Sequence, residues 1–358
     1  MSSSKYFFFL AIYIAVVVAS LISLGASKCS KAPVLFNFGD SNSDTGGVGA
    51  LMVENVLMYP NGRIFFQYPT GRLCDAEDLK IGYVTPYLES LNPNFKNGAN
   101  FALAGSSAMP GEICPYSLKT QVFEFVRFYN RSLQLRLEGH ENLLEEDNFR
   151  NGLYMIDIGQ NDLKNAFDTI PAYDQIIQQR IPKFISKIGE AMQAIYANGG
   201  RKFWIHNTGP LGCLPGTLSI KKPNASEVDD YGCVASINRA AQEFNSKLNA
   251  LCEGLRFELQ NSTIVYVDVY AIKYKIIASA SSYGFEQPLM ACCGYGGPPY
   301  NIDPKIGCGK AGHNLCAASS PHISWDGFHY SEAANSIVAS MILSGNYSSP
   351  PLPFDFFC

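Results

Sequence analysis

Five short apolar runs, separated by longer helical patterns, constrain the fold more than any other feature of this chain. The runs at 34–38, around Phe101, and at 153–158, 202–207 and 264–269 have the composition of strands buried on both faces. Helical patterns follow at 173–197, 234–259 and 331–343. Strands that alternate with helices predict an α/β protein, a three-layer α/β/α sandwich with a mostly parallel sheet and right-handed crossovers.

The first run ends abruptly in the polar sequence GDSNSDTGG at 39–47. Ligands of open α/β sheets bind at the carboxyl ends of the strands, so Ser41 lies where a nucleophile would be useful. The alternative is an ordinary polar turn in which Ser41 or Asp44 caps the next helix. This stretch alone does not decide between the two interpretations.

A candidate partner for Ser41 lies near the other end of the chain, in SWDGFHYS at 324–331. A serine nucleophile needs an imidazole to accept its proton and a carboxylate to orient that imidazole. Asp326 and His329, three residues apart, can supply both groups from one segment, although Asp326 could instead cap the helix expected from Ser331. The remaining histidines have no comparable setting and are expected to be structural or surface residues: His140, His206, His313 and His322.

The usual nucleophile elbow G-x-S-x-G is absent around Ser41, so other segments must supply the oxyanion hole. Two polar stretches follow predicted strands and can do so: NFALAGS at 100–106 and IGQND at 158–162. Gly105 could also serve only as a tight turn. Asn161 could be a loop residue that bonds its own backbone.

Taken in chain order, the four segments at 39–47, 100–106, 158–162 and 324–331 resemble the plant GDSL esterase/lipase family of the SGNH hydrolase superfamily. NTGPLGCLP at 207–215 resembles a further block of its secreted plant members. CCGYGG at 292–297, together with GDSNSDTGG, resembles the early-nodulin and α-fucosidase-like branch. The resemblance extends over nearly the whole chain beyond its first residues.

The resemblance implies a flavodoxin-like sheet and a secreted serine esterase that hydrolyses carboxylic esters through an acyl-enzyme, without metal or cofactor. Ser41 would be the nucleophile, and Asp326 and His329 would complete the triad. The oxyanion hole would consist of the Ser41 and Gly105 N–H groups and the Asn161 side chain. Two alternatives stay open: an acyltransferase that uses the same triad, and a catalytically impaired glycoprotein with a binding or defence role.

One segment departs from the family pattern. PTGRLCD at 69–75 runs straight into AEDLK at 76–80, where the family continues with Gly-Arg and an apolar helix. Such a helix normally covers one face of the sheet. We therefore expect 73–93 to be the core-adjacent segment that opens most easily.

The start of the chain predicts export. Residues 1–27 have the pattern of a signal peptide, with Lys5, an apolar run at 6–18 and small residues at 23–27. The alternative is an uncleaved membrane anchor. The remainder, 28–358, is expected to be a single hydrolase domain and a monomer that acts on a small-molecule or glycan ester. A formal net charge of -4 argues against nucleic acid as a partner.

Cysteines and glycosylation sequons favour an extracellular, cell-wall or vacuolar location. The chain has 11 cysteines, and an odd number leaves at least one thiol unpaired. The spacing of the cysteines at 292, 293, 308 and 316, with His313, matches no zinc pattern well. Sequons begin at Asn130, Asn224, Asn261 and Asn346.

Overall fold

The computed structural model describes residues 32–51, 60–62, 84–90, 93–111, 115–141, 143–317 and 321–358. The predicted signal peptide and the departure at 69–80 lie outside the described residues. Most of 73–93 lies outside them too, so the expectation of easy opening there remains a prediction.

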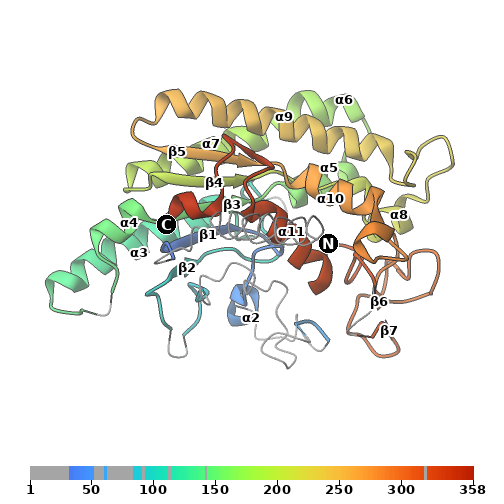
Figure 1. Cartoon of the computed structure of the whole chain (residues 1–358), viewed down its shortest axis with the longest axis horizontal. Coiled ribbons are helices and arrows are strands. Elements are labelled where there is room, and N and C mark those ends of the chain that lie inside the picture. Colours follow the sequence, from blue (N-terminus) through green and yellow to red (C-terminus); the bar gives the residue numbers. More distant parts are fainter. Residues whose placement is uncertain are drawn as a thin grey trace, which may run out of the picture.

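The centre of the described structure is a six-stranded sheet with the order β2-β1-β3-β4-β5-β8. Neighbours from β2 to β5 run parallel, and β8 is an antiparallel edge strand. Figure 1 shows β2, β1, β3, β4 and β5 one beside the next, which is the flavodoxin-like order. The strands are β1 (Leu35–Gly39), β2 (Gly98–Asn100), β3 (Leu153–Asp157), β4 (Lys202–His206), β5 (Thr263–Val267) and β8 (Ser348–Ser349).

Helices on both faces complete the three layers. They are α2 (Gly47–Leu51), α3 (Leu118–Leu137), α4 (Glu146–Asn151), α5 (Gln160–Thr169), α6 (Tyr173–Gln175), α7 (Ile181–Ala197), α8 (Pro215–Lys221), α9 (Ala235–Glu258), α10 (Val269–Ala278) and α11 (Glu332–Leu343). A small second sheet pairs β6 (Cys293–Gly294) with β7 (Asn314–Leu315). The predicted fold class is confirmed.

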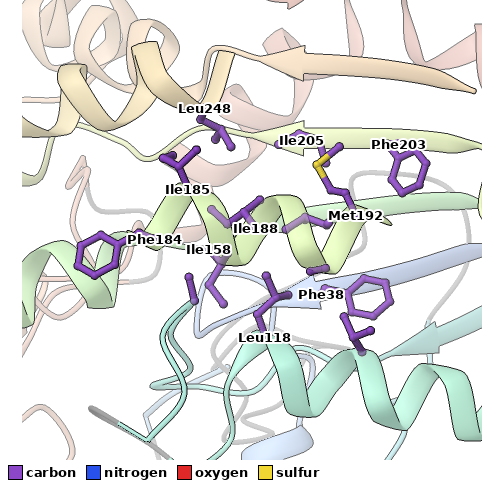
Figure 2. Packing of buried hydrophobic residues seen from close by; sticks show 14 of the residues in the cluster. Phe38, Leu118, Ile158, Phe184, Ile185, Ile188, Met192, Phe203, Ile205 and Leu248 are labelled. Carbon is purple, nitrogen blue, oxygen red and sulfur yellow. The ribbon is translucent and has the colours of Figure 1, made fainter. Parts of the chain in front are cut away.

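Alternating side chains of the strands build two separate cores. Phe38 and Phe203 point to the face covered by α3, α7 and α9, where Leu118 and Met192 meet them (Figure 2). Trp204, the next residue along β4, points to the other face, covered by α10, α11 and the end of the chain. Because a strand reverses side at each residue, strands buried on both faces must be apolar throughout.

The structure revises the helix predictions by interrupting one helix and by adding others. The single helix predicted at 173–197 is interrupted by a π-helical turn at Ile176–Arg180 between α6 and α7. Helices α3, α4, α5, α8 and α10 were not predicted. The buried stripe of α3 includes the polar side chains of Gln121 and Ser132, which hide its amphipathic period.

Three disulfides between described cysteines, together with the chain end, stabilise the outer loops. The bonds are Cys213–Cys233, Cys292–Cys316 and Cys293–Cys308. The last two link the loop after β6 to the β6 strand region. Cys252 is a buried free thiol, in keeping with the odd cysteine total. The C-terminal tail packs on the core, because the rings of Phe354 and Phe357 lie beside Trp204.

Candidate active site

The loop after β1 places Ser41 at the carboxyl edge of the sheet. Two buried asparagines fix this loop: the side-chain amide of Asn100 donates to the carbonyl of Ser43 at 2.7 Å, and that of Asn37 donates to the same carbonyl at 3.1 Å. The two amides also bond each other at 2.9 Å. Because β1 and β2 are neighbours in the sheet, the clamp ties the serine loop to the strand that precedes Gly105.

Helix α3 supplies a further anchor that the sequence did not reveal. The fully buried side chain of Gln121 accepts from the N–H of Gly39 at 2.9 Å and donates to its carbonyl at 2.7 Å. This pair satisfies the last peptide group of β1 just before the loop turns. The backbone therefore enters the loop at a fixed position, two residues before Ser41.

The carboxylate of Asp44 connects the serine loop to the Gly105 segment. It accepts the N–H groups of Gly46, Gly47 and Val48 at the start of α2. It also accepts the N–H of Ala104 at 2.8 Å. The helix-capping role considered for this turn therefore belongs to Asp44.

Gly105 and Asn161 lie on adjoining turns. Gly105 has a φ of 82°, which glycine adopts without the steric cost of a side chain. The Asn161 side-chain nitrogen donates to the carbonyl of Ser106 at 2.9 Å, and its second hydrogen can serve another acceptor. The neighbouring Asp162 holds the same segment by accepting from the N–H groups of Ala108 and Met109 at 2.8 and 2.9 Å.

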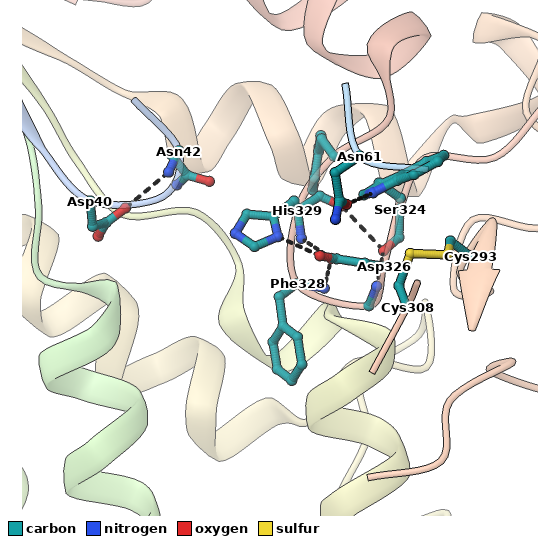
Figure 3. A network of polar contacts seen from close by, with 12 residues as sticks. Asp40, Asn42, Asn61, Cys293, Cys308, Ser324, Asp326, Phe328 and His329 are labelled. Atoms are coloured by element: carbon teal, nitrogen blue, oxygen red, sulfur yellow. Dashed lines mark hydrogen bonds and ion pairs between the residues drawn. A yellow bond between two sulfur atoms is a disulfide. The ribbon is translucent and has the colours of Figure 1, made fainter. Parts of the chain in front are cut away.

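Asp326 and His329 form a tight pair. Asp326 Oδ2 lies 2.6 Å from His329 Nδ1, and Oδ1 accepts the N–H groups of Phe328 and His329 at 3.0 and 2.8 Å. Figure 3 shows the other side of the His329 ring facing the loop that carries Asn42. Helix α11 is capped by the hydroxyl of Ser331, so Asp326 does not cap it.

The pair determines the ionisation of both partners. Burial alone would raise the pKa of Asp326, but the charge and hydrogen bonds of His329 outweigh it and leave the pKa below its usual range. Burial alone would lower the pKa of His329, but Asp326 outweighs that effect and leaves the pKa above its usual range. A carboxylate held ionised beside Nδ1 keeps the proton on that nitrogen and leaves Nε2 free to accept one.

Two buried carboxylates, those of Asp40 and Asp157, lie near the serine loop. Burial, reinforced by the neighbouring Asp157 carboxylate, raises the pKa of Asp40 to about 8. Burial also raises the pKa of Asp157 to about 6, against the opposing charge of Lys273. The side chain of Gln160 donates to Asp40 at 2.6 Å. Near neutral pH this pair retains a proton, which limits negative charge under Ser41.

One pocket brings most of the predicted residues together. Ser41, Asn161 and His329 all line it, with Asp326 behind His329. Gly105 is not among the lining residues and lies on the turn fixed by Asp44. No hydrogen bond joins Ser41 to His329 within the described residues. The apolar walls of the pocket are Phe167, Leu211, Leu214, Ile220, Ile237 and Phe328.

Residues 60–62 approach the histidine segment from a distant part of the sequence. Asn61 Oδ1 accepts the indole N–H of Trp325 at 2.8 Å, next to Asp326 (Figure 3). Through this bond Asn61 contacts the loop behind the pocket.

The flavodoxin-like sheet, with a serine loop and an Asp–His pair at its carboxyl edge, defines the molecule as a three-layer α/β/α hydrolase. The model of the GDSL-like Lipase/Acylhydrolase family matches residues 35–342, and the chain belongs to this family. The chain is 48% identical to the GDSL esterase/lipase LIP-4 of Arabidopsis thaliana, over 99% of this chain and 96% of the relative. It is 40% identical to the GDSL esterase/lipase ACHE of Zea mays, over 93% and 91%.

A third relative, an esterase of Hevea brasiliensis, is 39% identical over 93% of this chain and 90% of its own length. These matches confirm the predicted family and make the chain a carboxylic ester hydrolase. None of the described helices combines the length and apolar composition needed to cross a bilayer.

Proposed function

We propose that the protein hydrolyses carboxylic esters through an acyl-enzyme on Ser41. His329 Nε2 accepts the proton of the Ser41 hydroxyl as its oxygen attacks the ester carbonyl, and then gives this proton to the leaving alcohol. Water, deprotonated by the same nitrogen, attacks the acyl carbon and releases the acid. Asp326 stabilises the imidazolium that forms in each half of the reaction.

The oxyanion is stabilised by three donors in this proposal. These are the N–H groups of Ser41 and Gly105 and the second hydrogen of the Asn161 amide. Asp44 and Asp162 contact the Gly105 segment at Ala104 and at 108–109, and thereby hold the donors in place before substrate binds. Donors fixed in advance are worth more than mobile ones, because no reorganisation accompanies charge development.

The observation that supports the proposal most strongly is the Asp326–His329 pair, whose 2.6 Å contact lies beside a pocket shared with Ser41 and Asn161. An Asp–His pair with a purely structural role would not need to face a serine loop that comes from the opposite end of the sequence. The direct test is reaction with a fluorophosphonate. Stoichiometric labelling at Ser41 supports the acyl-enzyme, and an unlabelled, folded protein would favour the catalytically impaired alternative.

Hydrolysis and acyl transfer differ only in the acceptor. Both would use Ser41, Asp326 and His329 in the same way, and the hydrolase names of the relatives favour water. Product analysis with an isotopically labelled alcohol in excess separates them. Free acid as the main product supports hydrolysis, and the labelled ester would indicate a transferase.

Secretion to the extracellular space or cell wall is part of the proposal. The predicted signal at 1–27, the disulfides and the four sequons support it, and all four sequon asparagines are exposed on the surface. Protein expressed in a plant host and treated with an endoglycosidase should lose mass. An unchanged mass for the folded, exported protein would contradict glycosylation.

Replacing Asn161 by alanine tests the oxyanion donor. We expect kcat to fall by roughly 10²–10³, with little change in KM, because the amide contributes mainly when charge develops. The matched control is Asn165→Ala on the same helix, which should leave both constants near wild type. A change confined to KM would assign Asn161 to substrate binding instead.

Replacing Asp44 by asparagine tests how the loops are held. One carboxylate oxygen would become an amide that faces N–H donors, so two of the four acceptor contacts are lost or repelled. We expect a loss of roughly 1–3 kcal/mol in unfolding free energy. We also expect a lower kcat, because Ala104 and Gly105 are no longer tied to the serine loop. Unchanged kcat in a destabilised protein would limit Asp44 to helix capping.

A further inference from the structure

A second cavity, called the inner cavity below, lies on the sheet face that is covered by α10 and α11. Asn42 and His329 line both the active-site pocket and the inner cavity, so the two meet at these residues. Figure 3 shows the His329 ring between Asp326 and the loop that carries Asn42. The inner cavity therefore reaches the imidazole that acts as the base in the proposed reaction.

The register of the sheet builds the floor of the inner cavity. Asn37, Met155 and Trp204 lie side by side on β1, β3 and β4, and Asp157 and His206 lie side by side two residues further along. Because side chains alternate along a strand, all five point to the same face. The cavity extends from the first residue of β1 to the level of Asp157, four residues on, which is roughly 13 Å.

Four buried polar atoms of this lining have no hydrogen-bond partner among the described residues. They are Asn37 Oδ1, Trp204 Nε1, His206 Nε2 and Tyr330 Oη, and each of the four residues is more than nine-tenths buried. A buried polar atom without a partner costs free energy, and folded proteins rarely leave several together. The indole can only donate and the amide oxygen can only accept, so a ligand of this cavity must do both.

The charges in the lining favour a neutral ligand. The ammonium of Lys273, which lies 4.7 Å from the centre of the Tyr330 ring, lines the same cavity as the Asp157 carboxylate. Burial, together with the charge of Lys273, lowers the pKa of His206 to about 3 and keeps this imidazole neutral. One positive and one negative group balance each other. Water is neutral, donates and accepts, and typically makes about three hydrogen bonds in such a site.

We propose that the inner cavity holds a row of bound water molecules and supplies the water that cleaves the acyl-enzyme. The proposal rests on the acyl-enzyme proposed above. While an acyl group occupies the active-site pocket, the apolar walls of that pocket disfavour water, whereas the inner cavity retains water beside His329. Hydrolysis then precedes transfer to a larger alcohol, which does not fit between Asn42 and His329.

The proposed step transfers one proton and exchanges one bond. A water of the row gives a proton to His329 Nε2 as its oxygen bonds to the acyl carbon. The bond between that carbon and Ser41 Oγ then breaks, and Nε2 returns the proton to Oγ. The products are the free acid and the enzyme in its starting state.

Competition between water and an alcohol tests the water supply. Nitrophenyl butyrate is turned over in the presence of 1-hexanol, and the ratio of hexyl butyrate to butyric acid is measured. Ala339→Leu, which fills the inner cavity from α11, should raise this ratio about threefold to tenfold, the effect of about one lost hydrogen bond to the water. The matched control is Ala333→Leu on the exposed side of α11, which should keep the wild-type ratio.

Reaction with a fluorophosphonate separates water supply from support of His329. This reaction needs the triad but no water, so its rate should be the same in the wild type and in Ala339→Leu. A rate that falls together with hydrolysis would overturn the proposal, because the cavity would then only hold His329 in place. An unchanged product ratio in Ala339→Leu would overturn it as well. A wild type that does not react at all would contradict the proposed function itself.

Tyr330→Phe tests the hydration of the inner cavity, because it deletes only one of the four unpaired atoms. Loss of a hydroxyl that binds water should lower the melting temperature by about 1–3 °C, whereas loss of an unpaired hydroxyl from a dry cavity should raise it. The ratio of hexyl butyrate to butyric acid should rise, as in Ala339→Leu. Tyr231→Phe, which alters an exposed tyrosine, should change neither quantity. A higher melting temperature for Tyr330→Phe would overturn the proposal.

Discussion

Replacing Ser41 by alanine is expected to abolish ester hydrolysis while the fold remains intact. The loss in kcat should be at least about 10⁴-fold, because a triad without its nucleophile retains only the contributions of binding and the oxyanion hole. Stability should change by less than about 0.5 kcal/mol. The reason lies in the loop, which is fixed by Asn37, Asn100 and Asp44 rather than by the Ser41 hydroxyl.

The measurement compares hydrolysis rates and melting temperatures of the wild type, Ser41→Ala and the surface control Ser281→Ala. The control should match the wild type in both. Fluorophosphonate labelling should disappear in Ser41→Ala and persist in Ser281→Ala. Wild-type turnover by a folded Ser41→Ala protein would refute the acyl-enzyme.

The sheet was predictable because its strands are apolar on both faces, and such runs stand out against a chain with ordinary composition. Four predicted strands occur within one or two residues of their predicted bounds, and the fifth, predicted around Phe101, ends one residue earlier at Asn100. Helix α3 was not predictable, because Gln121 is buried in it to hold Gly39 and breaks the apolar period. A polar side chain that is buried to support the site interrupts the apolar pattern from which its helix would be predicted.

Short motifs identified the catalytic candidates, but they did not reveal the residues that hold these candidates in place. Ser41, Asn161 and His329 meet in one pocket, as the order of the motifs implied, although their roles await the experiments above. The disulfide partners depend on loop paths that spacing does not encode. The capping role of Asp44 was among the alternatives, whereas its bond to Ala104 spans 60 residues and needed the folded structure.

The electrostatic interaction between the buried carboxylates of Asp40 and Asp157 is not visible in the local sequence around either residue. Asp40 belongs to the serine motif and Asp157 ends a strand that pairs with β1, so their proximity follows from sheet register. Two ionised carboxylates there would oppose the oxyanion. The pKa of Asp40, raised to about 8, keeps this carboxyl protonated near neutral pH, whereas Asp157, with a pKa of about 6, is mostly ionised, so the pair carries about one negative charge rather than two.

Replacing Asp326 by asparagine should have the second-largest effect on catalysis. An amide can present its N–H₂ group to His329 Nδ1, which stabilises the tautomer whose Nε2 already carries a proton. We expect kcat/KM near neutral pH to fall by about 10⁴-fold, the cost of the wrong tautomer in a serine triad. Asp303→Asn is the matched control, because Asp303 accepts a backbone N–H two residues on, at 2.9 Å, just as Asp326 does.

The pH profile separates this catalytic effect from a structural one. In the wild type His329 must be neutral to act as a base, so activity is lost as the pH falls through its raised pKa, at a midpoint above the ordinary value of about 6.5. Without the Asp326 charge, burial, the largest effect, and Lys273 lower the pKa of His329, and only the weaker influence of Asp40 raises it, so the midpoint of the residual activity should move to lower pH. A variant that lost activity with an unmoved midpoint would show that Asp326 acts by holding the loop, through the N–H groups of Phe328 and His329, rather than by setting the basicity of the imidazole.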